Sequence, residues 1–131
     1  MKKQLVQFDQ QRSDLTNAEK NVLFEGGTEP QFSGALDMEF RTGKYYCNNC
    51  HELLFTSTAK FDSGCGWPSF TEPSDADNVT LLVDTSHGMV RTEVRCRRCG
   101  GHLGHVFDDG PIDQGGQRYC INSLSLSFTQ E

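Results

Sequence analysis

Two Cys-x-x-Cys pairs constrain the fold of this chain more than any other feature. The pairs are Cys47 with Cys50 and Cys96 with Cys99, and 45 residues separate them. Each pair turns two sulfurs toward one point, so together they predict a closed tetrahedral site of four thiolates. Sulfur ligands without a carboxylate favour one structural zinc ion, with iron as the alternative in a reducing compartment. A metal bound in this way contributes about 10 kcal/mol or more to folding.

Other interpretations of these four cysteines compete with the metal site. One pair could be a thioredoxin-like redox motif, but that motif belongs near a βαβ unit, and no such pattern occurs in the sequence. The four could also be unrelated buried cysteines. A zinc-ribbon binding module without catalysis would explain the pairs, but it leaves Cys65, Trp67 and Cys120 without a role.

Length and composition limit the classes of protein that this chain can represent. Its 131 residues predict a single domain, and 35% hydrophobic residues with 13 glycines predict a modest core with many turns. A net charge of −6 argues against nucleic-acid binding, which needs clustered Lys and Arg. The sequence has neither a signal-peptide pattern nor an apolar run of about 18 residues. We therefore expect a cytoplasmic protein without membrane contact, in a compartment that keeps thiols reduced.

The apolar pattern predicts a mainly antiparallel β fold with one or two short N-terminal helices. Residues 1–14 are polar and are expected to be loosely ordered, so the single domain spans residues 15–131. Thr16 and Glu19 form a capping-box pattern for a helix that runs to about Phe24. Strands are expected at residues 44–47, 53–55, 79–83, 89–95, 103–107, 118–121 and 124–128. Short strands at this spacing indicate a β-rich α+β fold with two small sheets or an open barrel.

The two unpaired cysteines lie in unusual surroundings. Cys65 lies between two glycines and before Trp67, in a loop whose backbone can take conformations that other residues resist. Cys120 lies in an expected strand beside Arg118, a cation that favours the reactive thiolate. For Trp67, the only tryptophan, plain core packing is the competing interpretation. The two sulfurs are therefore candidates for thiol chemistry.

Two histidines, His102 and His105, follow the second cysteine pair. A histidine near the nucleophile could activate it or donate a proton to the group that it attacks. Strict strand alternation would place the two side chains on opposite faces of a strand, so we expect them to have different roles. A hydrogen-bonded structural histidine is the alternative for each, and metal ligation is disfavoured because four sulfurs already complete a site.

Several longer segments resemble the signature sequences of the peptide-methionine (R)-S-oxide reductases, the B-type methionine sulfoxide reductases. These segments are residues 64–70 (GCGWPSF), 86–91 (SHGMVR), 102–107 (HLGHVF) and 118–123 (RYCINS). Residues 28–30 and 32–34 resemble the opening segment of the family, and the resemblance extends from about residue 15 to residue 128. The paired cysteines resemble those of the zinc-containing members. The resemblance also implies the small antiparallel β fold of that family.

The resemblance implies a role for each matching position. Cys120 matches the nucleophile that attacks the sulfoxide sulfur, and Cys65 matches the recycling cysteine. Trp67 matches the tryptophan that packs against the substrate methyl group. His105 and Asn122 match residues that polarise or protonate the sulfoxide oxygen. The remaining matches are polar residues of the same pocket, His102 and Arg118, and an acidic residue near it, Asp109.

The implied reaction is thiol-dependent reduction of the R epimer of methionine sulfoxide, in oxidised proteins or as the free amino acid. It passes through a sulfenic acid on Cys120 and a Cys65–Cys120 disulfide, which thioredoxin reduces. The resemblance implies a role in protein repair under oxidative stress, with no organic cofactor, and a monomer is expected. A rival enzyme of similar fold would act on other small electrophiles, such as a glutathione-adduct lyase, but residues 118–123 argue against it.

Overall fold

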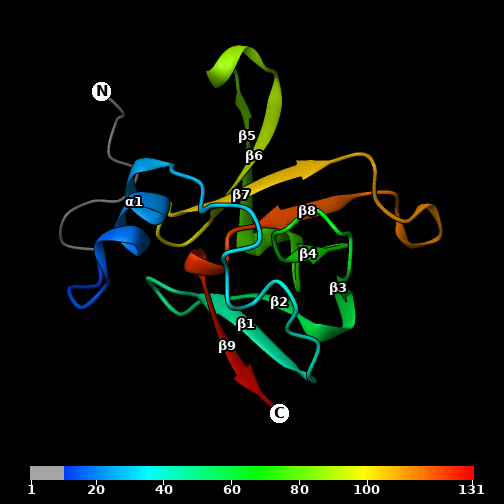
Figure 1. Ribbon diagram of the computed structural model, residues 1–131, viewed down its shortest axis with the longest axis horizontal. Helices are drawn as coiled ribbons and strands as arrows, with labels where there is room; N and C mark the ends of the chain where they lie inside the picture. Colours follow the sequence, from blue (N-terminus) through cyan, green and yellow to red (C-terminus); the bar gives the residue numbers. More distant parts are fainter. Residues whose placement is uncertain (1–10) are drawn as a thin grey trace.

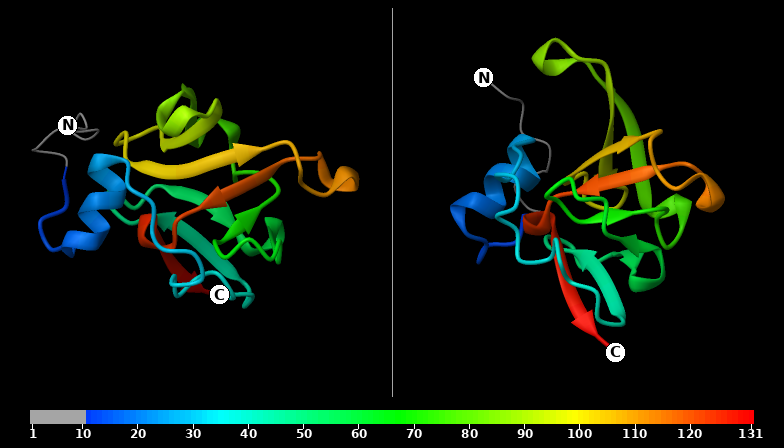
Figure 2. Two further views of the ribbon diagram at one scale, coloured as in Figure 1. Left: turned by 45° about the horizontal axis from the view of Figure 1, so that its top comes forward. Right: turned by 45° about the vertical axis from the view of Figure 1, so that its right-hand side comes forward.

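The computed structural model describes residues 11–131, which form one α-helix and two antiparallel sheets (Figures 1 and 2). The smaller sheet has the strand order β2-β1-β9, and the larger has the order β3-β4-β8-β7-β6-β5. The strands are β1 Gly43–Cys47, β2 Leu53–Thr56, β3 Lys60–Phe61, β4 Ser69–Phe70, β5 Val79–Asp84, β6 Arg91–Cys96, β7 His102–Phe107, β8 Arg118–Ile121 and β9 Leu126–Gln130. The predicted β-rich fold class is confirmed.

The helix α1, Asn17–Glu25, begins at the predicted capping box. The Glu19 N–H donates to the Thr16 hydroxyl at 3.2 Å, and the Thr16 N–H donates to the Glu19 carboxylate at 2.8 Å. These bonds satisfy two amide groups that the first helical turn would otherwise leave unpaired. The helix ends at Gly26 in the left-handed conformation, and Leu23 is fully buried where α1 packs against β7.

Aromatic side chains from both sheets form the core. Phe55 of β2 stacks on Phe70 of β4 with ring centroids 4.3 Å apart, and Tyr45 of β1 meets the same ring edge-on at 5.0 Å. All three rings are fully buried. Each aromatic pair contributes about 0.5–1.5 kcal/mol beyond the area it buries. The smaller sheet is therefore fixed against the part of the larger sheet that includes β4 and β8.

Strands β5 and β6 form a hairpin that extends away from the body of the molecule (Figure 1). The predicted strand 89–95 begins two residues too early, because Ser86–Gly88 form a 3₁₀ turn and β6 begins at Arg91. Val90 is 82% exposed, so the apolar character of these residues does not reflect burial in a sheet. Similarly, β9 begins at Leu126 because a 3₁₀ turn occupies Ser123–Ser125.

A bulge in β7 changes the expected alternation of its side chains. Val94 of β6 lies opposite Gly104, but the next residue, Arg95, lies opposite His102, so Leu103 is an extra residue on the β7 side. An extra residue reverses the face on which the following side chains lie. The expectation that His102 and His105 lie on opposite faces is therefore wrong, and their ring centroids are 5.5 Å apart.

The N-terminal segment is described only in part. The first ten positions of the segment predicted to be loose, residues 1–14, lie outside the described residues. At Arg12 the chain is held: its N–H donates to the Asn49 side chain at 2.6 Å, and its guanidinium donates to the Asn48 carbonyl at 2.7 Å. Within residues 11–131, no helix has the length and apolar character needed to span a membrane.

Candidate metal centre and active site

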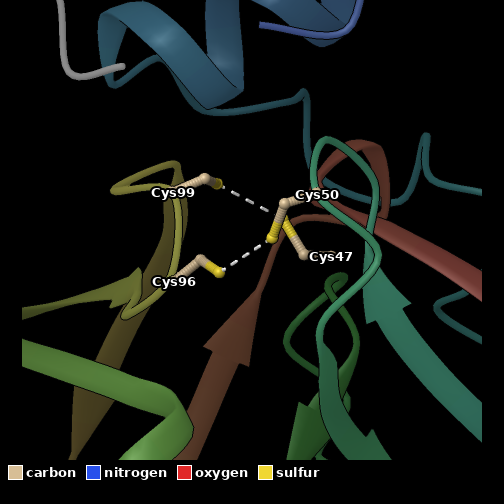
Figure 3. Close-up of side chains that lie close together, drawn as sticks. All are labelled: Cys47, Cys50, Cys96 and Cys99. Carbon is tan, nitrogen blue, oxygen red and sulfur yellow. Dashed lines mark hydrogen bonds between the residues drawn. The ribbon is translucent and has the colours of Figure 1, made fainter. Parts of the chain in front are cut away.

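The four paired cysteines converge on one point (Figure 3). Their Sγ atoms all lie within 4.8 Å of one another, with Cys47 and Cys99 at 3.7 Å and Cys50 and Cys96 at 3.5 Å. Metal–sulfur bonds of about 2.3 Å place tetrahedral sulfur ligands about 3.8 Å apart. The sulfur positions therefore fit a four-coordinate metal ion.

The same local turn positions both pairs. The carbonyl of Cys47, at the end of β1, accepts a bond from the His51 N–H at 2.8 Å, and the carbonyl of Cys96, at the end of β6, accepts one from the Gly100 N–H at 2.8 Å. Both donors have a left-handed backbone. Because β1 and β6 belong to different sheets, a metal bound here would connect the two sheets.

The two unpaired cysteines meet in a different place, at the surface of the larger sheet. Their Sγ atoms are 3.9 Å apart, although 54 residues separate them in the sequence. They line a cavity of about 220 Å³. Six of the predicted site residues line it together: Cys65, Trp67, His105, Arg118, Cys120 and Asn122.

Strand pairing explains why these residues converge. Cys120 lies in β8 between two neighbouring strands, opposite Ser69 of β4 on one side and His105 of β7 on the other. Cys65 lies in the loop that joins β3 to β4 and is flanked by Gly64 (φ +74°) and Gly66 (φ +95°). Side chains strongly disfavour these left-handed values, so the two glycines permit the tight loop that returns Cys65 to β8.

Hydroxyl groups surround the sulfur of Cys65. The Ser63 hydroxyl donates to this sulfur at 3.0 Å, and the Ser69 hydroxyl lies 3.4 Å from it. Burial acts to raise the pKa of the Cys65 thiol, but hydrogen bonds with Ser63, Ser69, the Trp67 backbone and Cys120 together outweigh it and hold that pKa below its ordinary value. Cys65 is therefore the thiol of this pair that ionises more readily.

Cys120 has the opposite electrostatic environment. Burial raises the pKa of its thiol to about 12, and the neighbouring charge of Cys65 acts in the same direction. Arg118 lowers the pKa only in part, and its guanidinium is bound by the Asp109 carboxylate at 2.9 and 3.2 Å. Arg118 therefore favours the thiolate of Cys120, as expected from the sequence, but burial and Cys65 outweigh its effect on the pKa. These surroundings favour the protonated form of the Cys120 thiol, so a nearby base would assist any attack by its sulfur.

Each histidine has a carboxylate partner that sequence reasoning missed. His105 Nε2 lies 2.8 Å from Asp84 Oδ2, and His102 Nδ1 lies 2.6 Å from Glu93 Oε2. Burial lowers the pKa of His105, and Asp84 offsets this only in part, so the ring is neutral at pH 7. No local sequence pattern connects these pairs, since Asp84 precedes His105 by 21 residues and β6 lies between their strands.

One buried residue, Glu29, connects two residues of the cavity wall, Trp67 and Asn122, to the turn that follows β8. Its N–H donates to Asn122 Oδ1 at 2.9 Å, its carbonyl accepts from Trp67 Nε1 at 3.0 Å, and its carboxylate accepts from the Leu124 N–H at 2.9 Å. Asn122 Nδ2 donates to the Leu103 carbonyl at 2.9 Å, which leaves its second N–H for a substrate oxygen. The family signature included residues 28–30 but did not indicate this role.

Two predicted site residues, although described by the structure, lie outside the lining of this cavity. The Asp109 side chain is 65% exposed and binds Arg118, whose guanidinium also lies 4.6 Å from the centre of the Phe107 ring. His102 is buried behind His105 and bonds to Glu93. Both residues therefore contact groups that line the cavity rather than the cavity itself.

Comparison with known proteins gives a consistent family assignment. A model of the SelR domain matches residues 15–130. The "Peptide methionine sulfoxide reductase MsrB" of Photorhabdus laumondii is 53% identical over 118 residues, which cover 90% of this chain and 86% of that protein. The protein of the same description from Cellvibrio japonicus is 53% identical over 120 residues, which cover 92% of this chain and 85% of that protein.

A solved structure resembles this fold at lower sequence identity. The crystal structure of the Mis18 'Yippee-like' domain aligns with a TM-score of 0.52 and 20% identity, over 70% of this chain and 98% of that one. That likeness concerns the fold alone. The SelR match and the two relatives at 53% identity show the family and its activity. They confirm the family that the signature segments predicted. This chain is a methionine sulfoxide reductase and belongs to the B-type, SelR-domain family.

Proposed function

We propose that this protein reduces the R epimer of peptide-bound methionine sulfoxide, with Cys120 as nucleophile and Cys65 as recycling thiol. The observation that carries the proposal is the 3.9 Å separation of these two sulfurs in one cavity with an indole and an imidazole. A sulfoxide is a polar S–O group on an apolar thioether. Its reduction needs a soft nucleophile, a proton donor at the oxygen and an apolar site for the methyl group.

The first step transfers oxygen from methionine to the enzyme. The Cys120 sulfur attacks the sulfoxide sulfur, its S–H proton leaves, and the S–O bond of the substrate breaks. Oxygen and one proton end on Cys120 as a sulfenic acid, and methionine leaves as the thioether. The second N–H of Asn122 and a protonated His105 are the donors to the oxygen in this step.

The second step closes a disulfide. The Cys65 thiolate attacks the sulfur of the Cys120 sulfenic acid, an S–S bond forms, and hydroxide leaves as water after taking up a proton. The pKa of Cys65, lowered below its ordinary value by hydrogen bonds to its sulfur, supports this role because the thiolate is the attacking form. A dithiol protein of the thioredoxin class then reduces the disulfide and is itself oxidised.

Selectivity for one epimer follows from two fixed positions. The Trp67 ring is the site for the methyl group, and Asn122 with His105 is the site for the oxygen. Fixing both substituents of a chiral sulfur admits only one configuration. With dithiothreitol as reductant, we expect full consumption of a peptide methionine (R)-sulfoxide and none of the (S)-sulfoxide, measured by chiral chromatography. Equal rates for the two epimers, or an intact R epimer, would contradict the proposal.

The proposal includes one zinc ion at the four-cysteine site. Four thiolates complete a tetrahedral shell, so the metal has no open position for substrate and acts in folding. Cys47, Cys50, Cys96 and Cys99 would hold it. The same proposal takes residues 15–131 as one catalytic domain that works as a monomer. A cytoplasmic location and a role in repair under oxidative stress stay predictions.

Replacing Cys65 by serine separates the two steps. The Cys65→Ser variant is expected to release about one methionine per enzyme in a single turnover, because the first step uses only Cys120. It should then stall with thioredoxin, since the disulfide cannot form. Rapid-quench measurement of methionine, with and without thioredoxin, checks this. Unimpaired thioredoxin-driven turnover would mean that another group does the recycling.

Replacing Trp67 by alanine removes the apolar site for the methyl group. A contact of this size in an apolar pocket is worth roughly 1–3 kcal/mol, so kcat/KM for the sulfoxide should fall about 10- to 100-fold. The melting temperature should change little, because Trp67 is only partly buried at the cavity wall. The Trp67→Phe variant is the control, since it keeps an aromatic face but lacks the N–H that binds Glu29. A collapse of the melting temperature in Trp67→Ala would favour plain core packing.

A further inference from the structure

We infer that Asp84 is a positioning residue for His105: it fixes the imidazole so that His105 takes the proton of the Cys120 thiol and delivers it to the sulfoxide oxygen. The inference rests on the proposed function of Cys120 and His105. It adds a residue that the signature segments do not include, and it gives His105 the role of a base before that of an acid.

Three contacts fix the Asp84 carboxylate. Asp84 is the last residue of β5, and its Oδ2 atom lies 2.8 Å from His105 Nε2 and 3.3 Å from the Arg91 guanidinium. Its Oδ1 atom accepts a bond from the Ser86 N–H at 2.9 Å. Only 18% of the side chain is exposed. The carboxylate therefore cannot turn away from His105 without breaking bonds to the hairpin.

This contact determines which nitrogen of His105 bears the proton. A carboxylate only accepts hydrogen bonds, so Nε2 must carry the hydrogen and Nδ1 of the neutral ring is left with a lone pair. His105 lies directly opposite Cys120 on the neighbouring strand, and both line the cavity. The ring thus keeps one nitrogen free to accept a proton, and it belongs to a residue that lines the same cavity as the nucleophile.

The proton balance of the reaction matches this arrangement. Attack by Cys120 releases one proton from its thiol, which burial keeps protonated, and the transferred oxygen needs one proton to become the sulfenic acid. A neutral His105 can accept the first proton through Nδ1 and, as imidazolium, donate it to the oxygen. No external acid, base or electron donor is needed for this step.

The charges around His105 identify Asp84 as the group that stabilises the imidazolium. The groups that face the ring are Asp84 on β5, Arg91 and Glu93 on β6, His102 on β7 and Cys120 on β8. Arg91 and His102 act to lower the pKa of His105, whereas Asp84 acts to raise it. Loss of the Asp84 charge should therefore lower the pKa of His105 further.

The Asp84→Asn variant of the full-length, metal-loaded protein tests the inference. The amide can donate to Nε2 and so favour the wrong tautomer, as in hydrolases whose orienting aspartate is replaced. We expect the single-turnover rate to fall about 100-fold, within the range of acid–base assistance. The KM for the sulfoxide should stay within about twofold, because Asp84 does not contact the substrate. The acid limb of the pH–rate profile should move to lower pH.

Asp75 provides a matched control. Its Oδ1 atom accepts a bond from the Asp77 N–H at 2.9 Å, which is the same turn that Asp84 makes with Ser86, but no histidine contacts it. Asp75→Asn therefore removes the same charge from the same kind of turn. Its single-turnover rate should equal that of the unaltered enzyme. The Asp84→Glu variant keeps the charge and should recover part of the rate that Asp84→Asn loses.

A double-mutant cycle decides whether Asp84 acts through His105. In a His105→Gln background, Asp84→Asn should cause no further loss. A full additional loss there, or an unchanged rate for Asp84→Asn alone, would overturn the inference. If Asp84→Asn fails to fold, ¹⁵N NMR of the unaltered protein decides: a ring of His105 with the proton on Nε2 supports the inference, and a proton on Nδ1 overturns it. Reduction of the R epimer by the unaltered enzyme tests the proposed function separately.

Discussion

Replacing Cys120 by serine is expected to abolish reduction of methionine (R)-sulfoxide, with a rate loss of at least about 10⁴-fold. A hydroxyl is a far weaker nucleophile than a thiolate toward sulfur, and oxygen cannot form the sulfenic acid that the second step consumes. No other described sulfur can replace it, because Cys65 is the only other cysteine that lines the cavity. Rapid-quench measurement of methionine over a single turnover checks the result.

The matched control is Cys65→Ser, which makes the same atomic change 3.9 Å away. That variant should still release methionine once, whereas Cys120→Ser should release none. Both should keep the melting temperature of the unaltered protein, because serine and cysteine have similar shapes and both sites border the cavity. A stoichiometric burst of methionine from Cys120→Ser would reject Cys120 as the nucleophile.

Removal of the metal is expected to unfold the protein. Zinc bound by four thiolates contributes about 10 kcal/mol or more, which is comparable to the whole stability of a typical domain, about 5–15 kcal/mol. The Cys47→Ser, Cys96→Ser double variant breaks both pairs and so removes the metal link between the two sheets. We expect it to contain no zinc and to lack a cooperative melting transition. Elemental analysis and calorimetry measure both quantities.

The Cys65→Ser, Cys120→Ser double variant is the control for metal removal. It loses two thiols as well, but neither belongs to the four-cysteine site. It should hold about one zinc per chain, the stoichiometry of a closed four-thiolate site, and melt like the unaltered protein. A metal-free Cys47→Ser, Cys96→Ser protein with an unchanged melting temperature would show that the fold does not depend on the metal.

Local patterns predicted the elements whose signals lie within a few residues. The Thr16–Glu19 capping box, strand β8 and the two Cys-x-x-Cys turns each depend on spacings of three or four residues, and each occurs where the sequence indicated. The short strands β3 and β4 escaped notice because two residues carry no periodicity. The alternation of apolar and polar residues likewise could not reveal the bulge at Leu103, because the bulge arises from the register in which β7 pairs with β6.

The residues of the candidate site also fall into two groups, those that a local sequence segment identified and those that only the folded structure reveals. Residues within the signature segments, such as Cys120 and Trp67, were identified from the resemblance, and the structure brings them to one cavity. Asp84 and Glu93 were missed because each acts on a histidine from another strand. From the sequence, Asp84 would be interpreted as an aspartate that stabilises a turn, and its Oδ1 atom does accept a bond from the Ser86 N–H in such a turn. The pKa values of Cys65 and Cys120 also depend on burial, which residue type does not reveal.

The position of Glu29 has a consequence for biosynthesis. Its main-chain and side-chain groups connect the tryptophan loop to Asn122, a residue 93 positions later in the chain. A ribosome adds Glu29 to the chain 93 residues before Asn122, so the pocket wall cannot assemble on a nascent chain that lacks β8. Assembly of the catalytic pocket therefore has to wait until β8 has been synthesised.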